Sequence, residues 1–310
     1  MRLKYYKSTI YKEIKKLYFQ HFKYLNIDDE IINQTFNQNI LYMIKTLDIN
    51  YFNFKKLIDD YFGLSKEHYI IQSDTLLKYE NLLLTADEII NSNLSTEKEN
   101  HPILNELISL LTDLSDESYL VGGAVRDMIN GSELKDFDFV TDTPYNLLQS
   151  VLESHGYKAK QVGNKYLVLH VSKFEEQFEI SNFRKDGVYL NGRRPETVEI
   201  GTIEDDAERR DFTCNSLYFD LKNNEILDPT GQGLMGVMNK KLNFIGKADN
   251  RIEEDYLRVF RGYRFMSKGY KASELTLKAL RKNFDQACKR VSSERIMNEI
   301  ERIVYETIKH

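Results

Sequence analysis

The sequence predicts an α+β protein with strands in its central part and helices at both ends. Short apolar or alternating segments at 119–121, 136–139 and 178–181 have the pattern of strands. Residues 1–112 and the stretch from Glu253 instead show apolar side chains spaced three and four apart, which is the pattern of amphipathic helices.

The N-terminal third is expected to be helical and of unknown role. Residues 1–100 contain almost no glycine or proline, so little interrupts their helical spacing. Asn91 to Pro102 is polar and ends in a proline, which favours a connecting segment. We therefore expect residues 101–112 to be a linker into the following domain.

A glycine turn follows that linker. Tyr119 to Val121 is a short apolar strand, Gly122 and Gly123 interrupt it, and Ala124 to Ile129 is expected to continue as a helix. Glycines at such a turn let backbone N–H groups approach phosphate oxygens, and the nearby Arg126 would add a cation. A tight turn without any ligand is the alternative.

Two carboxylates come next, in the alternating segment Asp136 to Phe139. A strand here turns Asp136 and Asp138 to one face and the phenylalanines to the core. At about 4 Å and an effective dielectric constant of about 20, two such charges repel by roughly 4 kcal/mol. A divalent cation relieves that repulsion, and oxygen ligands suit Mg²⁺ or Mn²⁺ in a two-metal site. A solvent-facing edge strand is the alternative.

A third carboxylate and an arginine pair follow. Glu179 lies in another alternating strand, and beside the first two acids it would complete a three-carboxylate metal site; an exposed charge is the other interpretation. Arg209 and Arg210 follow the acidic run 204–206, an order that also suits a helix with a negative N-terminal and a positive C-terminal end.

Asp255 and Arg258 lie three residues apart in a helical pattern, about 60° around the axis, so both can point at one ligand. A carboxylate accepts from an exocyclic amino group and a guanidinium donates to a ring acceptor, a combination offered by cytosine and adenine. The pair can therefore act as a protein template for C and A. An ordinary salt bridge on a helix surface is the alternative.

Taken in order, these segments resemble the motifs of one family, the class II tRNA nucleotidyltransferases and bacterial poly(A) polymerases, within the polymerase-β-like nucleotidyltransferases. The resemblance covers roughly residues 113–305. The matching segments are GGAVRD with DFD, FEISNFRKDGVYLNGRRPETVEI (178–200), RRDFTCNSLYFD (209–220), LDPTGQG (227–233), EEDYLRVFRGYRF (253–265) and SSERIMNEI (292–300).

The resemblance implies a fold and a domain plan. It predicts a polymerase-β-like head with a mixed, mostly antiparallel sheet and helices at 113–246, flanked by all-helical domains on both sides. A helical neck carrying the nucleobase-reading motif is expected at 247–310. The longer relatives continue into helical body and tail domains that grip tRNA, which the 310 residues do not include.

The resemblance also implies roles for particular residues. It assigns the catalytic metal ions to Asp136, Asp138 and Glu179. The nucleotide is expected to contact Gly122, Gly123, Arg126, Arg210, Asp255, Arg258, Arg261 and Arg264. Arg264 is the least well placed of these, since a straight helix carries it about half a turn from Asp255.

The implied reaction adds C, A or both from nucleoside triphosphates to an RNA 3′ end, with release of pyrophosphate and with two Mg²⁺ ions. CCA addition to tRNA, with CTP and ATP as substrates, is the first expectation, because the E-D-x-x-R pattern is intact. The alternatives are poly(A) or oligo(A) addition and a tRNA-modifying toxin or effector. A non-catalytic RNA-binding remnant is disfavoured because both acids of DFD are present.

Composition agrees with a soluble cytoplasmic protein. The 310 residues, 41% of them hydrophobic, suffice for more than one domain. A long uncharged apolar run and the apolar core of a signal peptide are both absent, so no membrane partner is expected. Cys214 and Cys288 form no disulfide framework. The net charge is −5, yet lysines crowd both ends and can neutralise RNA phosphates. The oligomeric state is not indicated.

Overall fold

The structure is a computed structural model. It describes residues 66–309, apart from 133, 135, 162–167, 188 and 190–194. The chain divides into two compact units, Met1–Thr85 and Ala86–His310. The expectation of a helical bundle therefore lies outside the described residues for positions 1–65. All that follows concerns the second unit.

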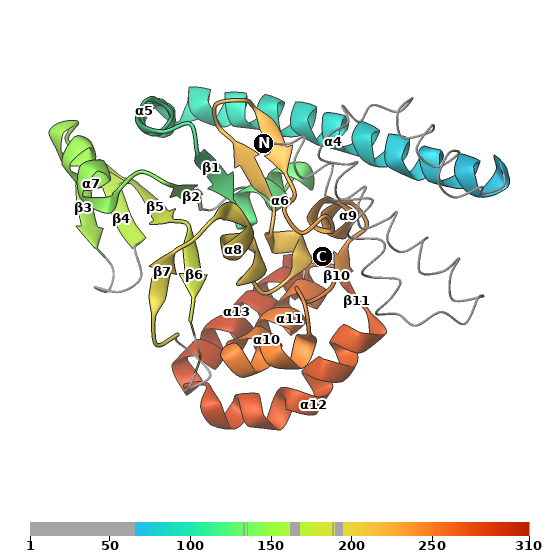
Figure 1. Ribbon diagram of the computed structural model, residues 1–310. Coiled ribbons are helices and arrows are strands. Elements are labelled where there is room, and N and C mark those ends of the chain that lie inside the picture. The colour runs from blue at the N-terminus through green and yellow to red at the C-terminus, as the bar shows by residue number, and fades with distance from the viewer. Residues whose placement is uncertain are drawn as a thin grey trace. The chain divides into compact units, whose positions relative to one another are not determined.

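A seven-stranded mixed sheet forms the centre of this unit (Figure 1). The strand order is β3-β4-β5-β2-β1-β8-β9, and each neighbouring pair is antiparallel except β2 and β5, which are parallel. The strands are β1 (Ser118–Val121), β2 (Asp138–Thr141), β3 (Lys158–Gln161), β4 (Val168–Lys173), β5 (Glu176–Asn182), β8 (Tyr218–Asp220) and β9 (Glu225–Leu227). The predicted α+β head with a mostly antiparallel mixed sheet is confirmed.

Two small sheets accompany it. β6 (Arg184–Asp186) pairs with β7 (Val198–Ile200) in antiparallel fashion, and β10 (Lys241–Leu242) pairs with β11 (Lys271–Ala272) in parallel. The helices are α4 (Lys66–Asn100), α5 (Pro102–Leu114), α6 (Gly123–Ile129), α7 (Tyr145–Ser154), α8 (Ile203–Glu208), the short 3₁₀ turn η1 (Thr213–Asn215), α9 (Gly233–Met238), α10 (Ala248–Glu254), α11 (Leu257–Ser267), α12 (Glu274–Arg290) and α13 (Ser293–Lys309).

Two aromatic clusters mark the core. Tyr119 on β1 lies with its ring centroid 5.7 Å from Phe183 and 6.3 Å from Tyr218, inside the sheet layer. Phe212 packs 5.3 Å from Phe265, which joins the segment before η1 to α11. The second cluster fixes the C-terminal helices against the head, because burying such rings is a large part of the apolar free energy of folding.

The predicted linker is wrong. Residues 102–114 form helix α5, which buries Leu104, Leu107, Ile108 and Leu111. Pro102 stands in the first turn of that helix, where the missing N–H costs nothing, so this proline starts a helix instead of ending a connection. The polar stretch from Asn91 is likewise the end of α4, and the two helices break only at His101.

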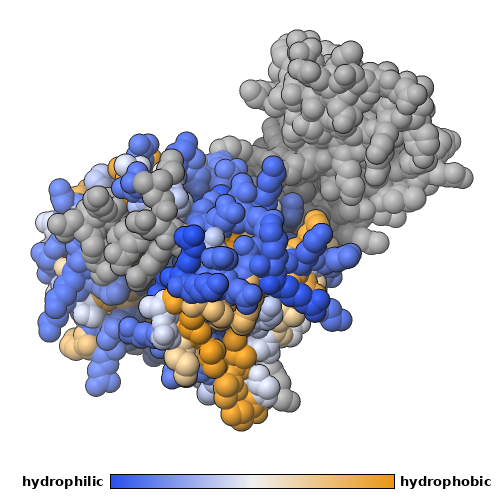
Figure 2. Space-filling view, turned by 90° about the horizontal axis from the view of Figure 1, so that it is seen from below, coloured by the Kyte–Doolittle hydropathy of each residue, from blue (hydrophilic) through white to orange (hydrophobic). Residues whose placement is uncertain are grey.

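The C-terminal helices α10–α13 gather on one side of the sheet (Figure 1). Helix α13 exposes a row of apolar side chains: Met297, Ile300, Val304 and Ile308. Figure 2, which views the molecule from below, shows apolar side chains gathered on that face. Among the described residues, no helix is both long enough and apolar enough to cross a membrane.

Candidate functional site

The glycine turn and the carboxylates meet at one edge of the sheet, which is the edge where the central strand β1 ends and its neighbours β2 and β8 begin. Leu120 on β1 pairs with Phe139 on β2, so the next residues of the antiparallel pair, Val121 and Asp138, bring the turn and the acid to the same edge. Tyr218, the first residue of β8, pairs with Val121 and therefore lies at the same edge. The sheet therefore brings the residues predicted to bind phosphate and those predicted to bind metal side by side.

Gly122 has a backbone reason to be glycine. Its φ is +65°, a conformation that residues with a side chain rarely adopt. A Cβ atom at this position would also lie 3.0 Å from Nη1 of Arg210. At Gly123, where α6 begins, a Cβ would lie 3.7 Å from Nη2 of Arg126. The two glycines thus leave room for two guanidinium groups beside the turn.

Arg126 is buried and already well partnered. Its Nε and Nη2 each donate to Asp127 at 2.7 Å, and its Nη1 donates to Oδ1 of Asn215. The guanidinium also stacks 5.0 Å from the ring of Phe265. Arg126 therefore ties α6 to η1 and α11, and only its remaining N–H donors are available to a phosphate.

Arg210 is held by a carboxylate that the sequence interpretation treated only as part of an acidic run. Nε and Nη2 of Arg210 donate to Asp206 at 3.2 and 3.0 Å, and Nε also donates to the Tyr218 hydroxyl at 3.0 Å. Burial opposes the ionised form of Asp206, yet Arg209 and Arg210 hold its pKa well below the ordinary value. The i, i+4 spacing of Asp206 and Arg210 is the sequence signal from which this pair could have been predicted.

Asp138 and Glu179 face each other across the parallel pair of strands. They are directly in register on β2 and β5. Burial, together with the charges of Glu179 and Asp136, raises the pKa of Asp138 to about 6, while Arg210 acts in the opposite direction. Carboxylates that repel one another in this way suit a hard divalent cation with oxygen ligands.

Asp136 does not share that strand. The predicted strand 136–139 begins instead at Asp138, and Asp136 is exposed in the preceding segment. The reason is that β1 ends at Val121, where the chain turns into α6, so Asp136 has no partner on that side. Among the described residues, no three side chains of His, Cys, Asp or Glu lie together as a metal cluster, so the expected three-carboxylate arrangement is not preformed.

His170 is a further side chain at this edge that the sequence interpretation missed. It lies opposite Glu179 on β4, and its Nε2 is 3.2 Å from Oε2 of Glu179. Both side chains are about half exposed, at 58% and 50%. The alternation of side chains along β4 could have placed His170 on one face of the sheet, but only the strand pairing identifies Glu179 as its neighbour.

Asp255 and Arg258 do not lie on one continuous helix, so that prediction is wrong. Asp255 has extended backbone angles between α10 and α11, and its Oδ1 accepts from the backbone N of Leu257 at 3.0 Å. Aspartate is favoured at such a position because it satisfies a free N–H at the start of a helix. Its carboxylate also pairs with Arg295 on α13, at 3.1 Å.

Each arginine of α11 has a carboxylate partner. Arg258 pairs with Glu254 at 2.6 Å and donates to the backbone oxygens of Arg251 and Arg209. The other two pairs, Arg261 with Asp211 and Arg264 with Glu299, both measure 2.6 Å. Arg264 is therefore directed to α13, while Arg258 and Arg261 are directed to the head.

Asp211 connects the region of the glycine turn to helix α11. It is buried, accepts from Asn215 at 3.1 Å and pairs with Arg261. Burial alone would raise the pKa of Asp211, but the charge of Arg261 holds that pKa well below the ordinary value. Since Asn215 also accepts from Arg126, a continuous polar chain runs from the glycine turn to α11.

Comparisons with known proteins agree with this geometry. Residues 118–243 match the family model described as the Poly A polymerase head domain. The CCA-adding enzyme of Streptococcus pyogenes serotype M2 (strain MGAS10270) is 31% identical over 200 residues, which are 64% of this chain and 48% of that enzyme. The chain thus spans about half the length of the curated relatives it matches.

Two solved structures are similar in fold. The crystal structure of the Bacillus stearothermophilus CCA-adding enzyme in complex with CTP has a TM-score of 0.55 and 28% identity, over 64% of this chain and 47% of that one. A tRNA nucleotidyltransferase complexed with a primer tRNA and an incoming ATP analog has a TM-score of 0.53 and 25% identity, over 66% and 58%. The resemblance predicted from the motifs is confirmed: residues 118–243 match the Poly A polymerase head family, and the chain is similar to CCA-adding enzymes in sequence and fold.

Proposed function

We propose that this protein is a nucleotidyltransferase that adds C and A from CTP and ATP to the 3′ end of tRNA and releases pyrophosphate. The observation that carries the proposal is the edge of the sheet where the Gly122 turn, Arg210 and the Asp138–Glu179 pair meet. The similarity to a CCA-adding enzyme in complex with CTP, and to a tRNA nucleotidyltransferase complexed with a primer tRNA and an ATP analog, supports it.

The metal ions would be held by Asp138 and Asp136, with Glu179 as the weaker third ligand. Mg²⁺, or Mn²⁺ in its place, would lower the pKa of the attacking 3′ hydroxyl and stabilise the charge of the leaving pyrophosphate. The donor set fits such ions because every ligand is a carboxylate oxygen and because Asp138 and Glu179 repel each other without a cation.

The protein's own contribution is to bind and orient the nucleotide. Arg210 and the backbone N–H groups at Gly122 and Gly123 would contact the triphosphate, with the remaining donors of Arg126 behind them. Because Asp206 and Tyr218 hold Arg210 in one orientation, its free donors are positioned before the substrate binds.

Base choice would rest on Asp255 and Arg258. Each is held by a second group, Arg295 and Glu254 respectively, and each retains lone pairs or N–H donors for a base. Such a pair discriminates through buried hydrogen bonds that an incorrect base leaves unsatisfied. Arg261 and Arg264, which pair with the buried carboxylates of Asp211 and Glu299, would support this region without reading the base themselves.

The test is to incubate the purified protein and Mg²⁺ with tRNAs ending before CCA, after CC and after CCA, with each nucleoside triphosphate alone and all together. The 3′ ends are then sequenced. Addition that stops at CCA supports the proposal. Extension beyond an intact CCA contradicts tRNA maturation and indicates a tRNA-modifying activity, and absence of any product contradicts transfer.

Poly(A) or oligo(A) addition is the second candidate, favoured by the match of residues 118–243 to a poly(A) polymerase head. Runs of untemplated A in the same assay would establish it. Asp255→Asn separates base choice from chemistry: incorporation of U or G should rise relative to C or A in this variant. Asp138→Asn should instead abolish transfer of every base, and Glu175→Gln, an exposed acid in the β4–β5 turn, is the matched control.

A further inference from the structure

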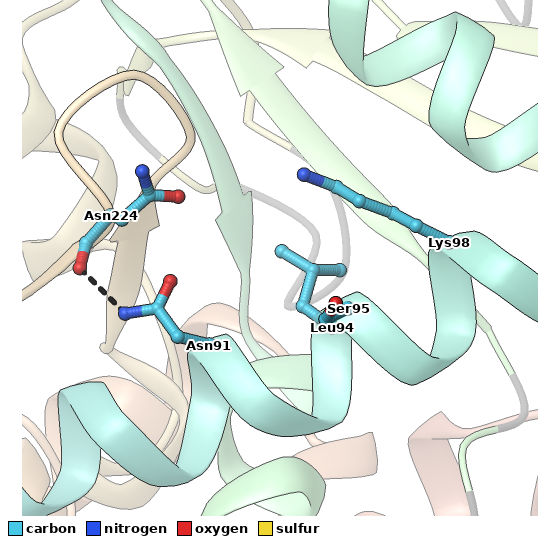
Figure 3. A pocket seen from close by; sticks show the side chains of 5 residues that line it. All are labelled: Asn91, Leu94, Ser95, Lys98 and Asn224. Carbon is cyan, nitrogen blue, oxygen red and sulfur yellow. Dashed lines mark hydrogen bonds between the residues drawn. The ribbon is translucent and has the colours of Figure 1, made fainter.

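A hollow with a volume of about 420 Å³ lies between the end of α4 and the β8–β9 hairpin. Its lining comprises Asn91, Leu94, Ser95, Lys98 and Asn224. Figure 3 shows the side chains of Lys98 and Asn224 reaching over this hollow from opposite sides. The hollow is separate from the candidate site. Strand β8 starts at that site with Tyr218 and runs away from it toward the hairpin.

The walls of the hollow are firmly joined. Asn91, Ser95 and Lys98 have the i, i+4, i+7 spacing that places them on one face of α4. Nδ2 of Asn91 donates to the backbone oxygen of Asn224 at 3.0 Å, and the backbone N of Ile226 donates to Asp87 at 2.7 Å. These bonds hold the helix against the hairpin, so the hollow does not depend on a loop closing over it.

Three donors line the hollow, and none of them has a partner among the described residues. Among the residues that the structure describes, no ion pair or hydrogen bond involves the Lys98 ammonium, the Ser95 hydroxyl or the side-chain amide of Asn224. Burial lowers the pKa of Lys98, and no nearby carboxylate offsets that loss of hydration. A partly buried ammonium in this situation is stabilised by an anion.

The chemistry of the lining selects the kind of anion. An ammonium, a hydroxyl and an amide N–H are hydrogen-bond donors suited to the several oxygens of a phosphate group, and the lining contains no carboxylate to repel it. We propose that this hollow binds a backbone phosphate of the RNA substrate. The inference deepens the proposed function and rests on it, since it supplies a grip on RNA within residues 86–310.

An RNA strand is the source of phosphate that the position favours. Strand β8 is three residues long, so the hairpin lies about 10 Å or more from the candidate site at the start of β8. A phosphate held there belongs to another part of the substrate than the reacting 3′ end.

The first experiment measures tRNA affinity by fluorescence anisotropy as a function of salt concentration. Lys98→Met removes the ammonium and keeps the apolar stem. Asn224→Gly removes the amide and keeps the backbone, whose φ is +55°. Lys158→Met is the control. Lys158 is an exposed lysine on β3, the outer strand of the sheet on the side opposite β9.

We expect Lys98→Met to weaken tRNA binding severalfold and to reduce the slope of log K against log salt by about 0.7 to 1, the value for one lost phosphate contact. The KM for tRNA should rise while kcat at saturating tRNA stays unchanged. Asn224→Gly should weaken binding with little change of slope. A wild-type slope in Lys98→Met, or an equal loss in Lys158→Met, would overturn the inference.

The second experiment identifies the source of the phosphate. Acetylation of Lys98 is followed by mass spectrometry in the presence of tRNA or of inorganic phosphate. Protection by tRNA, with or without protection by phosphate, supports the proposal; protection by phosphate alone, or by neither, overturns it. If the protein transfers no nucleotide to any RNA but the slope still depends on Lys98, the proposed function fails and the RNA contact stands. If transfer occurs and the slope does not change, only the inference fails.

Discussion

Replacing Asp206 by asparagine should remove much of the stability of the head. The Asp206 side chain is fully buried, at 0% exposure, and accepts hydrogen bonds from Arg209, Arg210 and the Tyr218 hydroxyl. Asparagine keeps the size but loses the negative charge, so the two arginines remain beside a neutral group. Breaking a buried charge network of this kind costs about 3–5 kcal/mol.

That loss is large compared with the stability of an ordinary domain, about 5–15 kcal/mol. We expect urea unfolding of Asp206→Asn to show a free energy of unfolding lower by about 3 kcal/mol or more. Glu208→Gln is the matched control, because Glu208 is exposed on the same helix, and it should change the free energy by less than about 0.5 kcal/mol. A loss below about 1 kcal/mol in Asp206→Asn would refute the reasoning.

The stabilisation that ionised Asp206 gives to the folded protein depends on pH. The pKa of Asp206 is lower in the folded protein than in the unfolded chain, so its stabilisation is present above the unfolded value of about 4 and is lost as pH falls below it. The difference in free energy of unfolding between the wild type and Asp206→Asn should therefore be constant from pH 7 to about 5 and narrow near pH 3.5. A difference that does not narrow would show that pairing of the ionised Asp206 carboxylate with Arg209 and Arg210 is not its source.

Three further predictions concern the candidate site and the helices beside it. Gly122→Ala should cost more stability than Gly131→Ala, because both glycines have positive φ but only a Cβ at 122 meets Arg210; urea unfolding of both should differ by about 1 kcal/mol or more. Binding of Mn²⁺, measured by electron paramagnetic resonance, should strengthen from pH 5 to 7, since the pKa of Asp138 is about 6 and its proton competes with the metal; Asp138→Asn should lose that dependence. Glu299→Gln should destabilise the protein by about 3 kcal/mol, because it leaves the buried Arg264 unpaired between α11 and α13, whereas Glu301→Gln, an exposed acid of the same helix, should not.

Local patterns predicted the parts of the site that depend on neighbours in sequence. The apolar run before Gly122, the two glycines and the helix after them form a strand, a turn and a helix within a residue of the expected bounds. The alternation around Glu179 identified β5 for the same reason, since strand periodicity is a property of one segment.

Patterns failed where a proline or a polar residue had two possible meanings. Pro102 looked like the end of a connection but begins α5, because its missing N–H is harmless in a first helical turn. Asp255 looked like a member of the α11 helix but precedes it, because its carboxylate satisfies the N–H of Leu257. In both cases the same residue type suits two local structures, so the residue by itself does not decide between them.

The sequence by itself determined the chemical groups of the candidate site and their order along the chain, because glycine turns, alternating acids and helical arginine spacing are local. Only the tertiary structure decided which groups meet. The parallel pairing of β2 with β5 sets Asp138 beside Glu179, and the fold brings Asp206 to Arg210 and Asp211 to Arg261. Strand register and the pairing of buried charges depend on segments far apart in the chain, so no local pattern specifies them.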